Sequence, residues 1–172
     1  YKAGHHVDIP AFRLSEALLG GEKCEIASSD WRESDPKQIN EWFNGLVSDY
    51  RKEREGKGLQ FRKMIRLLKR FCRSRPSWNM PSGLILTMLT AEKMPNYERD
   101  DECFYSLLKA VNERLKYDGL RVHNLSDDSI FGKEELTKSN DDPDVRNLRD
   151  KSSEALEKLQ VLFDDDCTQK KA

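Results

Sequence analysis

The sequence lacks closely spaced cysteines. Its four cysteines, Cys24, Cys72, Cys103 and Cys167, form no Cys-x-x-Cys pair. Structural zinc sites need such pairs, and disulfide frameworks belong mainly to much shorter secreted chains. We therefore expect reduced thiols and a cytoplasmic protein, with neither a zinc site nor a disulfide scaffold.

Long apolar runs and a charge excess are also missing. No segment is long and apolar enough to span a membrane, and no signal peptide is visible, so we expect no membrane partner. The 30 Lys and Arg residues almost balance the 31 Asp and Glu residues. This balance argues against binding to long nucleic acids. The chain of 172 residues, 37% hydrophobic, is long enough for one domain with a real core.

The charges that are present are unevenly distributed. The chain is mainly acidic from Asp127 onward, whereas the stretch 51–75 is strongly basic and contains only two acids, Glu53 and Glu55. Its basic residues are Arg51, Lys52, Arg54, Lys57, Arg62, Lys63, Arg66, Lys69, Arg70, Arg73 and Arg75. A local basic face on a nearly neutral protein favours a small phosphate-bearing ligand.

The pattern predicts an α+β fold that is mostly α, with a short strand region followed by a helical bundle. Residues 1–14 are expected to be extended, with Pro10 at a bulge or sheet edge. Gly20-Gly21 forms the expected turn before a return strand at 24–27. Because an isolated hairpin is marginally stable, and the sequence enters directly on a strand at Tyr1, we expect further strands from an upstream part of the protein.

The rest is predicted to be helical. Ser34-Asp35-Pro36 and Asp142-Pro143 are typical helix starts, with a capping side chain before a proline. Apolar residues at helical spacing predict helices over 36–55, 59–73, 84–94, 100–117 and 143–163, with a polar connection at 118–141. We expect three regions: strands at 1–30, a helical lobe at 31–163 and a flexible tail at 164–172.

Asp8 is the first candidate functional residue. In the run His5-His6-Val7-Asp8-Ile9, polar and apolar side chains alternate, which places Asp8 on the polar face of the predicted strand. An acid in this position is suited to binding a metal ion, but it is equally suited to a solvated or salt-bridged role. His5 and His6 are expected to face solvent rather than extend a metal site, and His123 in the polar connection carries no functional signal.

Lys69 and Ser82 are candidates for binding phosphate. Ser82 precedes the third predicted helix, whose N-terminus would present free backbone N–H groups to an anion. Lys69, at the end of the preceding helix, would supply a positive charge. The alternatives are an ordinary helix cap for Ser82 and the charged side of an amphipathic helix for Lys69.

Several segments together resemble a known family. The segment His6-Val7-Asp8-Ile9-Pro10-Ala11-Phe12-Arg13 resembles the strand that carries the third metal-binding aspartate in nucleotidyltransferases of the polymerase-beta superfamily. The sequence is most similar to the C-terminal part of bacterial cyclic oligonucleotide synthases, relatives of cyclic GMP-AMP synthase and oligoadenylate synthase. Segments 30–37 and 41–44 resemble the part leading into the family's helical lobe, and Arg66–Phe71 followed by Pro81–Leu86 resembles a part of that lobe.

The resemblance implies specific roles. Asp8 matches the third of three carboxylates that hold two Mg²⁺ ions, and it is therefore both the catalytic and the metal-binding candidate. Lys69 and Ser82 match the residues that contact the nucleotide triphosphate. Many relatives have a base-stacking aromatic residue where this chain has Gly83. The family's Gly-Ser turn and its first two carboxylates are absent, so we expect this chain to be inactive by itself.

The resulting expectation is part of an enzyme that joins ATP- or GTP-type nucleotides into cyclic di- or trinucleotide second messengers in bacterial anti-phage signalling. Its partners would be nucleoside triphosphates, the N-terminal part of the catalytic domain, and regulatory or effector proteins. Two alternatives stay open at this point. One is an RNA-tailing nucleotidyltransferase on the same scaffold, although an RNA substrate favours a longer basic track. The other is a non-catalytic helical interaction module in which Asp8 is a surface acid.

Overall fold

A computed structural model describes residues 11–16, 22–27, 30–33, 36–53, 58–128 and 132–160. These form three strands and five α-helices, which confirms the predicted fold class, α+β and mostly α. By its internal contacts the chain divides into two compact units, Tyr1–Asn44 and Gly45–Ala172. The predicted limits at residues 30 and 163 stay predictions.

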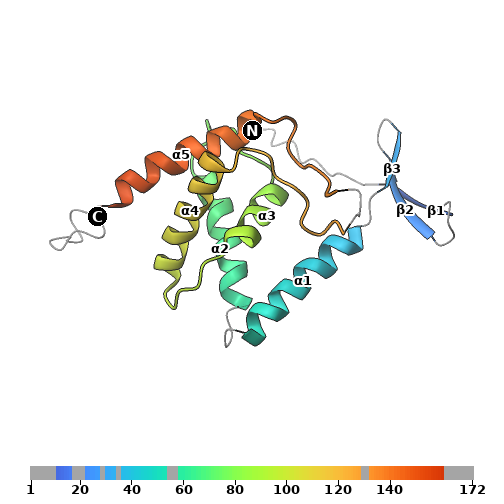
Figure 1. The fold of residues 1–172 in the computed structure, drawn as a ribbon, viewed down its shortest axis with the longest axis horizontal. Helices are drawn as coiled ribbons and strands as arrows, with labels where there is room; N and C mark the ends of the chain where they lie inside the picture. The colour runs from blue at the N-terminus through green and yellow to red at the C-terminus, as the bar shows by residue number, and fades with distance from the viewer. Residues whose placement is uncertain are drawn as a thin grey trace, which may run out of the picture. The chain divides into compact units, whose positions relative to one another are not determined.

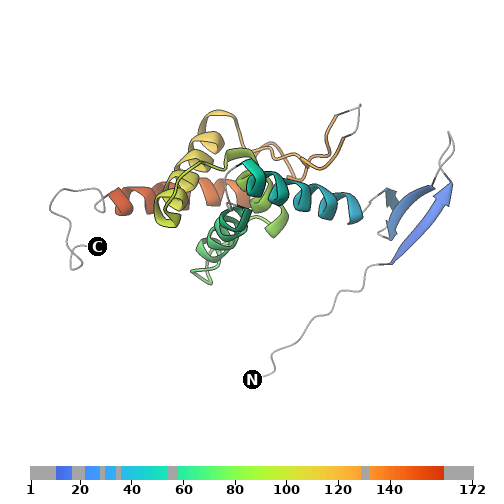
Figure 2. The same ribbon diagram turned by 90° about the horizontal axis from the view of Figure 1, so that it is seen from below.

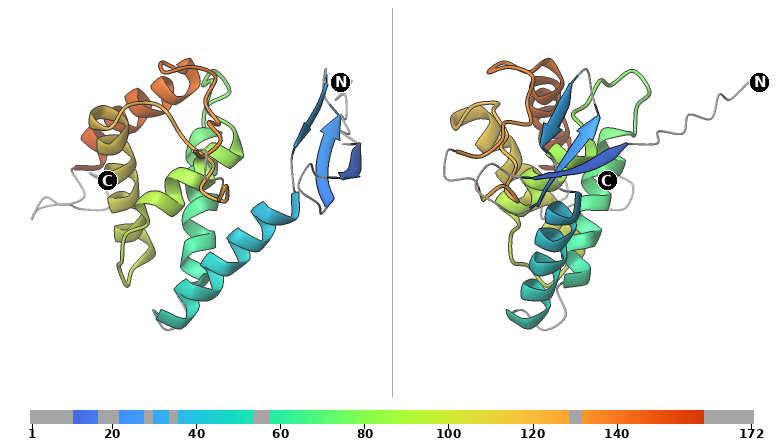
Figure 3. Two further views of the ribbon diagram at one scale, coloured as in Figure 1. Left: turned by 45° about the vertical axis from the view of Figure 1, so that its right-hand side comes forward. Right: turned by 90° about the vertical axis from the view of Figure 1, so that its right-hand side faces the viewer.

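The first unit contains a three-stranded antiparallel sheet, visible in Figure 3. Strands β1 (Phe12–Glu16), β2 (Glu22–Ala27) and β3 (Trp31–Glu33) follow one another in chain order. Phe12 pairs with Ile26 in the first ladder, and Ile26 pairs with Arg32 in the second. The return strand is confirmed, whereas Pro10, the predicted Gly20-Gly21 turn and residues 1–10 lie outside the described residues.

Strand β3 corrects the prediction that the chain is helical after residue 30. Trp31–Glu33 is only three residues long and contains two charged residues, so it shows no alternation of polar and apolar side chains. It is a strand because its backbone pairs with β2, a contact that no local pattern encodes. Sequence periodicity could not have found it.

The helices follow the predicted ranges closely. They are α1 (Pro36–Glu53), α2 (Gly58–Cys72), α3 (Gly83–Lys93), α4 (Asp100–Tyr117) and α5 (Pro143–Leu159). The predicted end at Phe163 and the predicted tail lie outside the described residues. None of the helices in the described part of the chain is long and apolar enough to cross a bilayer.

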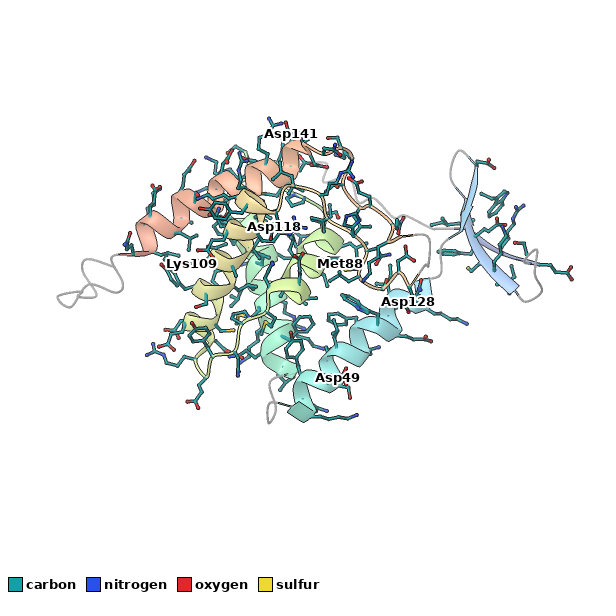
Figure 4. The ribbon with its side chains drawn as sticks, in the orientation of Figure 1. Asp49, Met88, Lys109, Asp118, Asp128 and Asp141 are labelled. Carbon is teal, nitrogen blue, oxygen red and sulfur yellow. The ribbon has the colours of Figure 1, made fainter. Side chains whose placement is uncertain are left out.

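The core of the second unit lies among α2, α3, α4 and α5 (Figure 1). Helix α3 is buried at six consecutive positions from Ile85 to Thr90, and its Met88 is labelled in Figure 4. The largest fully buried side chains include Phe61, Met64, Leu68, Met88, Leu89, Leu107, Leu108, Val111, Leu115, Val145 and Leu148. Each contributes roughly 1.5–3 kcal/mol through burial of apolar surface.

Two sets of hydrogen bonds hold the C-terminal part of this unit in place. The buried amide of Asn112 on α4 donates to the carbonyl oxygen of Arg149 (2.6 Å) and to Ser152 Oγ (2.8 Å), both on α5. In the connection between α4 and α5, which Figure 2 shows in yellow to orange, Arg114 donates to the carbonyl oxygens of Gly119 and Arg121. These bonds hold α5 against α4 and anchor the start of the long connection.

Candidate phosphate-binding site

A pocket of about 400 Å³ lies where α2 ends, the loop 73–82 turns back and α3 begins. Lys69 and Ser82, the two residues predicted to bind phosphate, both line it. Arg73, Arg75, Trp78 and Gly83 are also part of its wall. Its volume is within the range of ordinary small-molecule sites.

Helix α2 places Lys69 at the pocket through its amphipathic pattern. Ile65, Leu68 and Cys72 are buried on the core side of the helix, and Lys69 is half-buried at the edge of that face. Burial lowers the pKa of Lys69, and the positive charge of Arg73 lowers it further. The Lys69 side chain is thus partly shielded from solvent in the folded protein.

Gly83 gives the lysine side chain its room. A Cβ atom at position 83 would lie 3.3 Å from Lys69 Cε and 3.4 Å from Lys69 Nζ, closer than most Cβ contacts. The lysine thus crosses the first residue of α3. Its charge is brought to the N-terminal end of that helix.

Ser82 is the N-cap of α3, as its position before the helix predicts. Its Oγ accepts a hydrogen bond from the backbone N–H of Ile85 at 3.4 Å, and its carbonyl oxygen accepts from Leu86 at 3.1 Å. The first N–H groups of a helix have no intrahelical acceptor and carry partial positive charge. Because Ser82 and Gly83 both line the pocket, this helix end adds to its attraction for an anion.

Sequence reasoning did not single out Arg73 and Arg75 as site residues. Both are exposed residues of the pocket wall, and no carboxylate among the described residues lines the pocket. A signal for them was present in the sequence, which contains no Asp or Glu from residue 56 to residue 91. What the sequence does not show is that the chain after α2 folds back beside Lys69.

The loop 73–82 is held in place by contacts to two helices. Trp78 packs edge-on against Phe71 of α2, with ring centroids 5.5 Å apart. On the other side, Lys151 Nζ of α5 lies 5.9 Å from the centre of the Trp78 ring, and Asn147 Nδ2 donates to the carbonyl oxygen of Asn79 at 2.6 Å. These contacts fix the pocket wall without using the pocket's own cations.

The remaining candidates are not placed in this pocket. Asp8, His5 and His6 lie outside the described residues. His123 is exposed, pairs through its backbone with Glu135 and lines a separate pocket. Within the part of the chain that the structure describes, no group of three or more His, Cys, Asp or Glu side chains is arranged to hold a metal ion. The predicted Mg²⁺ site therefore stays a prediction.

No family model matches the chain. Its fold is similar to solved structures of DncV from Vibrio cholerae. One is this cyclic AMP-GMP synthase in complex with the linear intermediate pppA(3′,5′)pG, with a TM-score of 0.63 and 19% identity over 85% of this chain. A second, the di-nucleotide cyclase in complex with GTP and 5MTHFGLU2, has a TM-score of 0.60 and 18% identity over 85% of this chain. The chain spans 37% of the DncV chain in both comparisons.

Proposed function

We propose that this chain is part of a nucleotidyltransferase that joins nucleoside triphosphates into cyclic di- or trinucleotides. The observation that carries the proposal is the pocket in which Lys69 and Ser82 converge with two arginines and with no described carboxylate. The fold supports it, because the similar DncV structures are those of a dinucleotide cyclase, and one of them contains GTP.

In the proposed complex the triphosphate lies in this pocket. The Lys69 ammonium group donates to phosphate oxygens, and charge-assisted hydrogen bonds of this kind are about twice as strong as neutral ones. The N-terminus of α3 faces the same anion. Fixing the triphosphate orients the α-phosphate toward the attacking ribose hydroxyl of a second nucleotide, and such positioning lowers the entropic part of the barrier.

Asp8 is the proposed ligand of catalytic Mg²⁺, with two further carboxylates from a part of the enzyme outside this chain. Among the described residues no group of three or more His, Cys, Asp or Glu side chains is arranged to hold a metal ion. The span of 37% of DncV supports a larger complete enzyme, and we propose that this chain is inactive without the rest. We also propose that the enzyme acts in anti-phage signalling and that regulatory or effector proteins bind to it.

Nucleotide binding tests the pocket directly. The chain is titrated with ATP and GTP in the presence of EDTA by isothermal titration calorimetry, as wild type, Lys69→Gln and Arg66→Gln. Arg66 is the matched control because it is an exposed cation on α2 that does not line the pocket. We expect saturable binding that Lys69→Gln weakens about tenfold, the scale of one lost charge-assisted hydrogen bond, and that Arg66→Gln preserves.

Absence of binding by the wild type, or equal affinities of the two variants, would contradict the proposed function. The metal-binding role of Asp8 needs a separate test in a protein that contains both this chain and the proposed upstream half. There, Asp8→Asn should abolish cyclic product while ATP binding in EDTA stays unchanged. Undiminished product formation, or extension of an RNA primer instead of cyclisation, would contradict the assignment.

A further inference from the structure

The pocket brings like charges close together. Many cations elsewhere in the unit have an opposite charge beside them, but these have none among the described residues. Arg73 follows Lys69 by one helical turn, and its backbone N–H donates to the Lys69 carbonyl oxygen at 3.2 Å. Both side chains line the same pocket. Like charges at this spacing repel each other, so the pair is unfavourable unless something else balances it.

No described residue balances the pair. Neither Lys69 nor Arg73 forms an ion pair with any residue in the described ranges. Elsewhere in the same unit cations are commonly paired: Lys63 with Asp100 at 2.8 Å and Arg114 with Glu92 at 3.1 Å are two examples. Two adjacent unpaired cations that share one cavity are suited to an anion that carries more than one charge.

We propose that Arg73 is a second phosphate-binding residue of this pocket, and that with Lys69 it makes the pocket discriminate nucleotides by the number of their phosphate groups. The proposal rests on the proposed function, since it assigns a further role within the same site. A guanidinium group binds phosphate oxygens in a bidentate manner, which an ammonium group cannot do. Lys69 engages one phosphate group, and Arg73, four residues further on and just past the end of α2, engages its neighbour.

Arg73 and Lys69 have different expected effects on a series of ligands. A single phosphate group engages only one of the two cations, so its affinity should depend on Lys69 and hardly on Arg73. Pyrophosphate and tripolyphosphate reach both cations. An exposed arginine that only raises the local potential would instead strengthen the binding of each anion according to its charge, and Arg73→Lys, which keeps the charge, would then restore the affinity in full.

The experiment titrates the full chain with orthophosphate, pyrophosphate and tripolyphosphate in EDTA at fixed ionic strength. The variants are Arg73→Gln, Arg73→Lys, Lys69→Gln and the matched control Arg66→Gln. For the wild type we expect affinity to rise with each added phosphate group. Arg73→Gln should weaken tripolyphosphate about tenfold and orthophosphate less than twofold, and Arg73→Lys should restore the affinity only in part. Arg66→Gln should leave all three affinities unchanged.

Each other outcome has a defined meaning. If Lys69→Gln weakens all ligands and Arg73→Gln weakens none, the inference about Arg73 is overturned and the proposed function stands. If Arg73→Gln weakens all three ligands equally, the discrimination by phosphate number is overturned. If neither variant changes any affinity, both the inference and the proposed function fail. Far-ultraviolet circular dichroism confirms that the variants are folded, which is expected because Arg73 is exposed.

Discussion

The side chain of Lys69 lies beside Gly83 at the start of α3, close to the space that a Cβ at position 83 would occupy. A Cβ at position 83 would lie 3.3 Å from Lys69 Cε and 3.4 Å from Nζ. The backbone at Gly83 is helical, so the glycine supplies space here rather than an unusual conformation. The absence of a side chain at Gly83 thus allows a cation to reach the N-terminus of α3.

Substitution of Gly83 should therefore affect ligand binding more than stability. Gly83→Ala moves the flexible end of Lys69 by a few tenths of an ångström, and Gly83→Val moves it further. We expect a graded loss of ATP affinity, small for alanine and larger for valine. The free energy of unfolding of Gly83→Ala should change by less than about 1 kcal/mol. Calorimetric titration and urea unfolding measure the two effects.

Gly45 provides the control for this pair of variants. A Cβ at Gly45 meets nothing within 4 Å, and the residue lies inside α1. Gly45→Ala should stabilise the protein by about 0.5–1 kcal/mol through helix propensity and leave ATP affinity unchanged. Equal ATP affinities for Gly83→Val and the wild type would show that the contact with Lys69 does not position the ammonium group.

Lys69 should contribute to binding at the expense of stability. Burial and the charge of Arg73 lower its pKa, so the charged form is less favourable in the folded state than in the unfolded state. Lys69→Met keeps the aliphatic stem and removes the charge. We expect a higher free energy of unfolding at pH 7, together with triphosphate binding that is about tenfold weaker. A decrease in stability would contradict this account.

The increase in the free energy of unfolding expected for Lys69→Met should depend on pH in a definite direction. Between the lowered pKa and the ordinary value of 10.5, the unfolded state binds more protons at Lys69 than the folded state, so wild-type stability rises with pH in this window. The advantage of Lys69→Met should thus be full below the lowered pKa and shrink as the pH rises toward 10.5. Urea unfolding of both proteins at several pH values measures the difference, with Arg66→Met as an exposed control.

Local signals explain what could be predicted from the sequence. Pro36, Ser82 and the pair Asp142-Pro143 marked three helix starts correctly because capping and proline geometry depend only on neighbouring residues. Strand β3 was missed because its pairing with β2 is not local. The sequence also predicted that Lys69 and Ser82 act on the same phosphate group, whereas the approach of the Lys69 side chain to Gly83 depends on how α2 packs against α3 and was not predicted.

The arginines of the pocket could not be identified from the sequence for the same reason: their place depends on non-local contacts. The basic stretch was evident in the sequence, but it contains many cations, and only the path of the loop after Cys72 selects Arg73 and Arg75 for the pocket. That path depends on Trp78 packing on Phe71 and on the hydrogen bond between Asn147 and Asn79, which joins residues 68 positions apart. A pattern of residues within one helix cannot reveal contacts between residues so far apart in the sequence.

Asp142 should be essential for the stability of α5. Its Oδ1 accepts from the backbone N–H groups of Asp144 (2.9 Å) and Val145 (3.3 Å), and its Oδ2 accepts from that of Lys138 (2.9 Å). Burial raises its pKa, but these hydrogen bonds outweigh that effect and hold the pKa below its usual value. Asp142→Ala should cost about 1–3 kcal/mol, because a capping interaction is lost and buried N–H groups lose their acceptor.

Asp142→Asn should fall between alanine and the wild type, because an amide has one oxygen and can satisfy only one of the two sets of donors. Asp141, labelled in Figure 4, is the control: it is exposed and forms an ion pair with Arg146. Asp141→Ala should cost less than about 1 kcal/mol. Urea unfolding at pH 7 measures all three variants, and equal losses for Asp141→Ala and Asp142→Ala would refute the capping role.

Glu25 should stay ionised in unusually acidic solution. In the β-sheet its carboxylate accepts from Lys23 Nζ at 2.9 Å, Arg13 Nε at 2.7 Å and Ser15 Oγ at 3.0 Å. Hydrogen bonds from Lys23 and then Arg13 lower its pKa from 4.5 to about 2. The stability that these bonds provide is therefore fully present above about pH 4.5 and is lost as the pH falls toward 2.

Carboxyl carbon chemical shifts in a ¹³C-labelled sample measure this titration residue by residue. At about pH 3.5 an ordinary glutamate is mostly protonated, whereas Glu25 should still be ionised. Arg13→Gln should move its titration midpoint upward, because the guanidinium contact at 2.7 Å is lost. Glu25→Gln should destabilise the protein at pH 7, and this difference should diminish in acid. A wild-type midpoint at 4.5 or above would show that the three donors do not hold the carboxylate in solution.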